Sequence, residues 1–172
     1  MDRYLILRDW QSKQCNGIIY LCKNLNNCKK YVGTTRRPLE TRKAGHEKDA
    51  LAGRGGEGSL QQAIRKFGFN NFAFEIISRA TTLGELSDQE RYYIEFYNTL
   101  KPLGYNHNRG GSVSAGGEVF EFNGEFYLSM ADLADYYDIY EETLRKRVAA
   151  SWTLQQATNL EKPSEIKIDG IY

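Results

Sequence analysis

The sequence has no long hydrophobic run and contains few cysteines, histidines and prolines. No stretch of about 18 apolar residues occurs, which excludes a membrane-spanning helix. The first four residues include an acidic one and lead into no apolar core, so they do not form a secretory signal. The three cysteines (Cys15, Cys22 and Cys28) are odd in number, and their spacing matches no common zinc pattern. We therefore expect reduced thiols and a cytoplasmic protein without a structural zinc site.

Net charge is also nearly absent, at +1 over 172 residues, but the two parts of the chain differ. Residues 1–115 carry a charge of +7 and residues 116–172 carry −6. A basic N-terminal part favours an anionic partner. The alternative is a solvated surface on which charges are unevenly spread, and charge alone leaves both open.

The chain divides at a glycine-rich linker, residues 109–117, where the sign of the charge also changes. We predict one unit over 17–108 and a second over 118–160, with an N-terminal extension over 1–16. The tail, 161–172, repeats an apolar–polar–apolar run into Asp169-Gly170 that occurs earlier around Asn123-Gly124. It is either the start of a second copy of the C-terminal unit or a lone strand.

Hydrophobic patterning predicts an α+β first unit. Residues 17–23 and 29–33 form strands of a hairpin, and 72–78 form a third strand. Helices are predicted over 37–51 and 60–67, and a third is opened by Thr82 with capping-box spacing to Glu85. The order is β-β-α-α-β-α, a small antiparallel three-stranded sheet flanked by helices.

The second unit begins with the alternating run 119–128 around Asn123-Gly124, a strong hairpin signal. Two short helices follow, over 130–137 and 141–150, with a tight turn between them. This pattern predicts a helix-turn-helix. The alternative is an ordinary αα-hairpin that serves packing.

Six polar residues of the first unit supply what a metal-dependent phosphodiesterase needs. A carboxylate holds a hard divalent cation, a guanidinium binds phosphate oxygens, and Tyr or His moves a proton. Arg42 and His46 are four residues apart and so share a helix face. Each residue taken singly has an ordinary structural explanation. The set is Tyr20, Tyr31, Arg42, His46, Glu90 and Asn106.

The spacing of these residues resembles the signature of the GIY-YIG nuclease family. Gly17-Ile18-Ile19-Tyr20 is followed, eleven residues after Tyr20, by Tyr31-Val32-Gly33, with the glycine of the first motif one place early. Arg42, Glu90 and Asn106 then follow in family order. The resemblance covers residues 17–108 and implies a DNA endonuclease of the homing or mobile-element type. If a phage encodes it, the expected location is the cytoplasm of the host cell.

The resemblance also implies a role for each residue. Glu90 would bind one Mg²⁺ or Mn²⁺, Arg42 would hold the scissile phosphate, and Tyr20 would activate or position the attacking water. Tyr31 and His46 would assist proton transfer, and Asn106 would fix the backbone or the glutamate. Nearby basic residues, Arg36, Arg37 and Lys43, are expected to contact DNA.

The second unit resembles the modular DNA-binding domains appended to phage and intron nucleases. There the second helix enters a DNA groove, which would place Thr143, Arg145, Lys146 and Arg147 against double-stranded DNA. Arg147 has a packing or capping role as its alternative. A restriction-type nuclease, or an inactive DNA-binding regulator on the same fold, remain competing hypotheses, and the sequence leaves open whether the protein is a monomer or a dimer.

Overall fold

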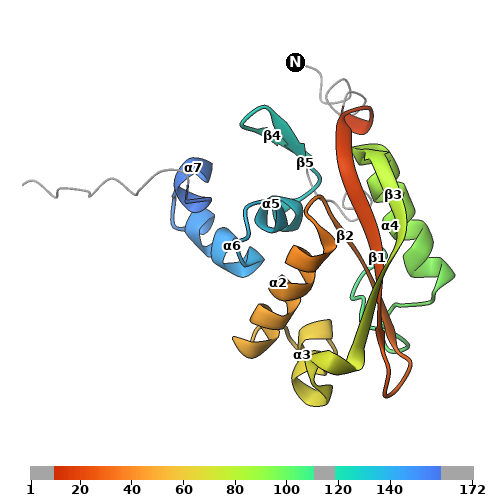
Figure 1. The fold of residues 1–172 in the computed structure, drawn as a ribbon. Coiled ribbons are helices and arrows are strands. Elements are labelled where there is room, and N and C mark those ends of the chain that lie inside the picture. Colours follow the sequence, from red (N-terminus) through yellow and green to blue (C-terminus); the bar gives the residue numbers. More distant parts are fainter. Residues whose placement is uncertain (1–9, 111–118, 160–172) are drawn as a thin grey trace, which may run out of the picture.

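The computed structural model of the chain describes residues 10–110 and 119–159 (Figure 1). The first range follows the predicted order β-β-α-α-β-α, with one short 3-10 helix added before the third strand. The α+β prediction is therefore confirmed. Its elements are β1 (Gln14–Asn24), β2 (Lys30–Thr35), α2 (Leu39–Leu51), α3 (Leu60–Phe67), η1 (Phe69–Asn71), β3 (Phe72–Thr82) and α4 (Leu83–Phe96).

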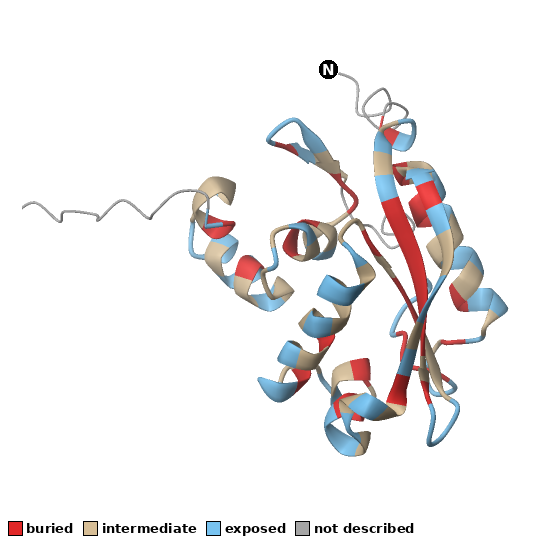
Figure 2. Cartoon of the chain, viewed as in Figure 1, coloured by how far each residue is buried: buried red, intermediate tan, exposed pale blue. Residues whose placement is uncertain are grey.

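The three strands form an antiparallel sheet in the order β2-β1-β3, so β1 lies in the centre. A central strand covered on both faces reads as a continuous apolar run, and Ile18 to Cys22 are all buried. Alternate residues point to opposite faces. Ile19 and Leu21 pack with α4, whereas Cys22 packs with α2 and α3. Figure 2 shows β1 as a continuous buried stretch in the middle of the sheet.

Three boundaries differ from the predicted ones for identifiable reasons. Strand β1 begins at Gln14, which pairs with Thr82, and β3 therefore continues beyond the predicted end at residue 78. Helix α2 begins at Leu39, with Pro38 as its N-cap, and not at Arg37. A residue that precedes proline is sterically disfavoured in the helical conformation, which excludes Arg37 from the helix.

Side-chain caps fix the starts of the later helices. The Ser59 side chain accepts a hydrogen bond from the Gln62 N–H, and the Thr82 side chain accepts one from the Glu85 N–H. The Glu85 carboxylate, however, accepts from the N–H of Thr81, 2.8 Å away, and not from that of the cap residue. Only the first hydrogen bond of the predicted capping box is therefore formed, and the Glu85 carboxylate bonds instead to Thr81, the residue before the cap.

The second range forms a small hairpin followed by three helices with a core of their own, which includes Leu133 and Leu144. Asn123 and Gly124 both have positive φ, 54° and 77°, as a two-residue type I′ hairpin turn requires. Ser129 caps the first helix as its sequence position suggested. The elements are β4 (Phe120–Phe122), β5 (Glu125–Tyr127), α5 (Met130–Tyr136), α6 (Glu141–Ala149) and α7 (Leu154–Ala157). Helix α7, which we did not predict, starts with a capping box from Thr153 to Gln156.

Several predicted boundary segments fall on residues 1–9, 111–118 and 160–172, which lie outside the described residues. The linker and a second copy of the C-terminal unit therefore stay predictions. Part of the predicted extension does pack with the sheet, because Trp10 is 2% exposed and belongs to the core below α4. The three cysteines are free thiols. None of the helices in the described parts combines the length and apolar character of a transmembrane span.

Residues 119–159, called the C-terminal module from here on, pack against the first unit beside β2 and α2 (Figure 1). Leu128 is buried in the same core cluster as Trp10, and Lys13 lies over the Phe126 ring. Helix α5 faces the end of β2, where Thr35 bonds to Asp135. The module therefore lies next to the residues for which we predicted chemistry.

Candidate active site

Tyr20 is the centre of a buried polar cluster. It lies on β1 opposite Gly33 of β2, and its side chain is fully buried. A Cβ atom on Gly33 would overlap the Tyr20 hydroxyl and would lie 2.7 Å from the Tyr31 ring. The glycine of the Tyr31-Val32-Gly33 motif is thus needed because the Tyr20 phenol crosses directly over it.

Helix α2 supplies the partners of the Tyr20 hydroxyl. His46 Nε2 lies 2.7 Å from the hydroxyl oxygen, and Arg42 Nε donates to the same oxygen over 3.2 Å. The two residues are one helical turn apart, so both reach down onto the sheet from one face of α2. Both nitrogens converge on one phenol oxygen, which is the arrangement that stabilises negative charge there.

Gln61, at the start of α3, determines which nitrogen of His46 carries the proton. The Gln61 amide nitrogen lies 3.2 Å from His46 Nδ1, and an amide nitrogen can only donate. Nδ1 is therefore the acceptor, and a neutral His46 carries its proton on Nε2, facing Tyr20. Nothing in the sequence marked Gln61 for this role, because the contact joins two helices.

Burial shifts the pKa values of this cluster in opposite directions. Desolvation raises the pKa of Tyr20 well above its usual value, and the neighbouring Arg42 opposes the shift. Desolvation lowers the pKa of His46 well below 6.5, and Arg42 adds to that effect. Although burial disfavours the charged form of Arg42, Tyr20 and Asp135 raise its pKa. At neutral pH the cluster holds a neutral phenol, a neutral imidazole and a guanidinium.

Tyr31 on β2 faces α2 beside Tyr20, and Glu90 lies on α4. The Tyr31 ring packs edge-on to His46 with centroids 5.8 Å apart, and burial raises its pKa against the effect of Arg42. The negative charge of Glu90 on α4 raises that pKa further, which places the carboxylate within electrostatic reach of Tyr31. The structure therefore brings five predicted residues, Tyr20, Tyr31, Arg42, His46 and Glu90, to one region.

Glu90 is the predicted metal ligand, and its surroundings suit a cation that keeps most of its water. Gly110, with φ of +67°, passes so close that a Cβ atom there would lie 3.1 Å from the Glu90 carboxyl carbon. The Gly110 backbone therefore packs directly against Glu90 and Ile94, where any side chain would clash. Within the described residues, no three His, Cys, Asp or Glu side chains gather to hold a metal. A single carboxylate with water fits Mg²⁺, which dehydrates reluctantly.

Asn106 acts on the backbone and not on the cluster. Its Oδ1 accepts from the Val32 N–H over 2.9 Å, and its Nδ2 donates to the Val32 carbonyl over 2.8 Å. The side chain thus pairs with β2 in the manner of an additional strand and satisfies the free edge beside Tyr31 and Gly33.

Comparison with known families places these residues in context. The profile of the GIY-YIG catalytic domain matches residues 16–106, more than half of the chain. The chain belongs to the GIY-YIG family. The family resemblance read from the sequence motifs is confirmed, and the buried cluster lies within the matched domain.

Two solved structures are similar to this GIY-YIG chain over the same region. The catalytic domain of the homing endonuclease I-TevI is 30% identical, with a TM-score of 0.47, over 54% of this chain and 98% of that one. A mutant of the catalytic domain of the intron endonuclease I-TevI is 28% identical, with a TM-score of 0.49, over 55% and 96%. No curated protein matches the chain.

The basic residues predicted to touch DNA have varied surroundings in this GIY-YIG protein. Arg36 lies over the rings of both Tyr127 and Tyr136, 4.8 Å from each ring centroid, and bonds to Asp132. Lys43 pairs with Glu40 on the surface of α2. On α6, exposed Arg145 and Lys146 pair with Glu141 and Glu142 one turn earlier, while Thr143 is half-buried. Arg147 donates to the Ala157 carbonyl and lies over Trp152, the capping arrangement named above as its alternative.

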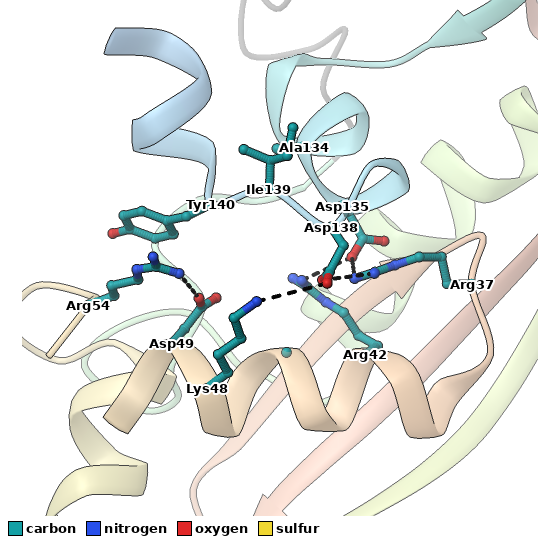
Figure 3. A pocket seen from close by; sticks show the side chains of 11 residues that line it. Arg37, Arg42, Lys48, Asp49, Arg54, Ala134, Asp135, Asp138, Ile139 and Tyr140 are labelled. Atoms are coloured by element: carbon teal, nitrogen blue, oxygen red, sulfur yellow. Dashed lines mark hydrogen bonds and ion pairs between the residues drawn. The ribbon is translucent and has the colours of Figure 1, made fainter. Parts of the chain in front are cut away.

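Three carboxylates of the module that sequence analysis missed pair with arginines of the first unit, and one of them, Asp135, bonds to the family arginine, Arg42. Asp135 accepts from both Arg42 and Arg37, and Asp138 accepts from Arg37 (Figure 3). With Asp132, they recur every three residues along α5 and the turn after it. That spacing, together with the opposite charges of the two units, was the available signal for an internal contact.

Proposed function

We propose that the chain is a divalent-metal-dependent DNA endonuclease that hydrolyses phosphodiester bonds at directed sites, of the homing or mobile-element type. The observation that carries this proposal is the convergence of His46 Nε2 and Arg42 Nε on the Tyr20 hydroxyl. Membership of the GIY-YIG family and the similarity to I-TevI, an endonuclease, support DNA as the substrate.

Tyr20 acts as the general base in this mechanism. The phenol gives its proton to solvent as the site opens to substrate, and the two donors hold the resulting phenolate, which takes a proton from the attacking water. His46 stays neutral and donates through Nε2, in the tautomer that Gln61 selects. Tyr31 packs against both rings and keeps them in place.

Arg42 serves both the base and the substrate. Its Nε donates to the Tyr20 hydroxyl, and its Nη1 points toward the module, where it donates to Asp135. In the complex with DNA, Nη1 would donate to a phosphate oxygen. A guanidinium binds two oxygens at fixed geometry, so one side chain aligns the phosphate with the base. Thus the distance between the Tyr20 oxygen and the scissile phosphorus is fixed by one residue.

Glu90 would hold the metal, next to the Gly110 backbone. A divalent cation bound there supplies neutralisation of the charge that develops on the phosphate and acidifies its bound water. Glu90 belongs to α4, on the opposite face of β1 from α2, so the metal ligand and Arg42 come from helices on opposite faces of the sheet, with the base, Tyr20, on the central strand.

The C-terminal module is proposed to add affinity for double-stranded DNA through α6. Arg145 and Lys146 are exposed, and their pairs with Glu141 and Glu142 are surface pairs one helical turn apart. Such pairs contribute little free energy, so phosphates can replace their carboxylates. The module's negative charge makes nonspecific binding by it weak, and the basic first unit supplies most backbone contacts.

The test is a cleavage assay with the purified full chain on supercoiled plasmid and on phage and bacterial genomic DNA. We expect discrete fragments with Mg²⁺ and none with EDTA. Glu90→Ala removes the proposed protein metal ligand and should abolish cleavage while DNA binding persists. Glu95→Ala, an exposed glutamate on the same helix, is the matched control and should cut normally.

Each alternative outcome has a defined meaning. Equal cutting by the wild type and Glu90→Ala would contradict the metal assignment. DNA binding by every chain without cleavage of any DNA would favour the inactive regulator.

A further inference from the structure

The carboxylate of Asp135 lies in a pocket of donors at the active site. Its Oδ1 accepts from Arg42 Nη1 over 3.0 Å and from Arg37 Nη2 over 2.9 Å, and its Oδ2 accepts from the Thr35 hydroxyl over 2.7 Å. The side chain is 10% exposed. Two guanidinium groups and a hydroxyl that converge on one anionic group form a site that binds phosphate oxygens equally well.

We propose that Asp135 occupies the position of a substrate phosphate, so that the docked C-terminal module keeps the active site closed until DNA displaces it. The inference rests on the proposed function and deepens it. It adds Thr35 and Arg37 to Arg42 as residues that bind the DNA phosphate.

The rest of the contact has the same polarity. Asp132 bonds to Arg36 over 3.2 Å, and Asp138 pairs with Arg37 over 3.0 Å and with Lys48 over 3.9 Å. Figure 3 shows Arg37, Arg42 and Lys48 of the first unit pointing toward Asp135 and Asp138 of the module, while Arg54 pairs with Asp49 of its own unit. In each of these ion pairs between the two units, the anion belongs to the module and the cation to the nuclease unit. The acidic face of α5 therefore covers these cations in the way that a DNA phosphate backbone would.

The contact also leaves donors unsatisfied. Among the described residues, Arg36 Nε and Arg37 Nε are buried without a hydrogen-bond acceptor. A buried donor without a partner costs free energy, which weakens the docked arrangement relative to one in which phosphate oxygens reach these atoms. The nearby charge of Asp135 also raises the pKa of Tyr20, which opposes its action as a base while the module is docked.

The experiment compares the full-length wild type with Asp135→Ala. DNA binding is measured by fluorescence anisotropy with a short DNA duplex of arbitrary sequence in EDTA, and cleavage is measured separately with Mg²⁺. We expect Asp135→Ala to bind about five- to tenfold more tightly, the gain from removing a closed state populated at about 80–90%. The cleavage rate at subsaturating protein should rise by a similar factor.

Three further variants separate competition from other effects. Glu121→Gln removes one exposed negative charge of the module away from the contact and should change binding less than about twofold. Adding Arg37→Ala to Asp135→Ala should abolish the gain in DNA affinity. That gain comes from the Arg37 guanidinium, which the loss of Asp135 releases for binding to phosphate. Asp138→Asn alters an exposed carboxylate, so folding is not at risk, and should tighten binding by about twofold. Circular dichroism melting verifies that each variant is folded.

The outcomes distinguish this inference from the proposed function. Unchanged or weaker binding by Asp135→Ala and Asp138→Asn, in a wild type that cuts DNA, would overturn the closed site and leave the nuclease intact. Tighter DNA binding by Asp135→Ala, with no cleavage by any chain, would contradict the proposed endonuclease activity. It would still support the competition between Asp135 and DNA phosphate for the arginines. If Asp135→Ala gains no more DNA affinity than Glu121→Gln, the effect is explained by net charge alone, and the inference is overturned.

Discussion

The two faces of strand β1 carry side chains of opposite character within the same few residues. Ile19 and Leu21 point toward α4 and join its apolar core, while Tyr20, between them, points toward α2 and a polar cluster. Both faces are equally buried. One face stabilises the fold through apolar packing, and the other holds the polar cluster. The interior tolerates these polar side chains because their buried polar atoms form hydrogen bonds with one another.

Two glycines mark the same division. A Cβ atom on Gly17 would lie 2.7 Å from Leu86 of α4, on the apolar side. A Cβ atom on Gly33 would overlap the Tyr20 hydroxyl, on the polar side. The early glycine of the first motif therefore makes room for helix α4, and the glycine of the second motif makes room for the Tyr20 phenol.

The largest effect is expected from Tyr20→Phe, which keeps the ring but removes the general base. Cleavage should fall by about 100-fold or more. His46 and Arg42 lose their common acceptor, which costs about 1–3 kcal/mol of stability. Tyr105→Phe is the matched control, because the Tyr105 hydroxyl is also buried and accepts from Asn24, 2.8 Å away, outside the cluster. Equal cleavage by both variants would remove Tyr20 from the mechanism.

The next effect belongs to the apolar face. Ile19→Ala should lower the free energy of unfolding by about 2–5 kcal/mol, because the side chain is fully buried against α4. Ile76→Ala, on the neighbouring strand and 40% exposed, should cost less than about 1 kcal/mol. Urea denaturation measures both. Cleavage by Ile19→Ala below its melting temperature should match the wild type, and a lasting loss would show that the two faces are not independent.

The smallest effect is the pH dependence that His46 gives to stability. Its folded pKa lies well below 6.5 because of burial and Arg42, so below about pH 6.5 the unfolded chain takes up a proton that the folded chain excludes. Stability is therefore retained above that pH and lost as the pH falls, by at most about 1.4 kcal/mol per unit.

Denaturation of the wild type and of His46→Gln between about pH 5.5 and 7.5 measures this contribution as the difference in slope. The variant should show the flatter profile. His107→Gln alters the other histidine, an exposed one whose pKa partial burial and Lys101 also lower, and should flatten the slope less than His46→Gln. Parallel profiles for wild type and His46→Gln would show that His46 is protonated in the folded protein.

Local sequence patterns predicted most of the fold. Asn123-Gly124 gave the hairpin turn and Ser129 the helix cap, because both depend on residues adjacent in the chain. Strand β3 was predicted too short, because its last residues are held by pairing with a segment nearly 70 residues earlier, Gln14 with Thr82. Family order in the sequence identified Tyr20, Arg42 and Glu90 as site candidates, but their distances and protonation were not accessible from spacing.

The sequence by itself determined the α+β order, the GIY-YIG membership and the identity of the residues that could carry chemistry, since these follow from periodicity, turn residues and motif spacing. Only the tertiary structure decided the rest. It placed Gln61 on His46 and fixed a tautomer, and it laid Asp135 on Arg42 across 93 residues of sequence. Such contacts depend on how helices pack in space, and a side chain's pKa and partner depend on what that packing buries beside it.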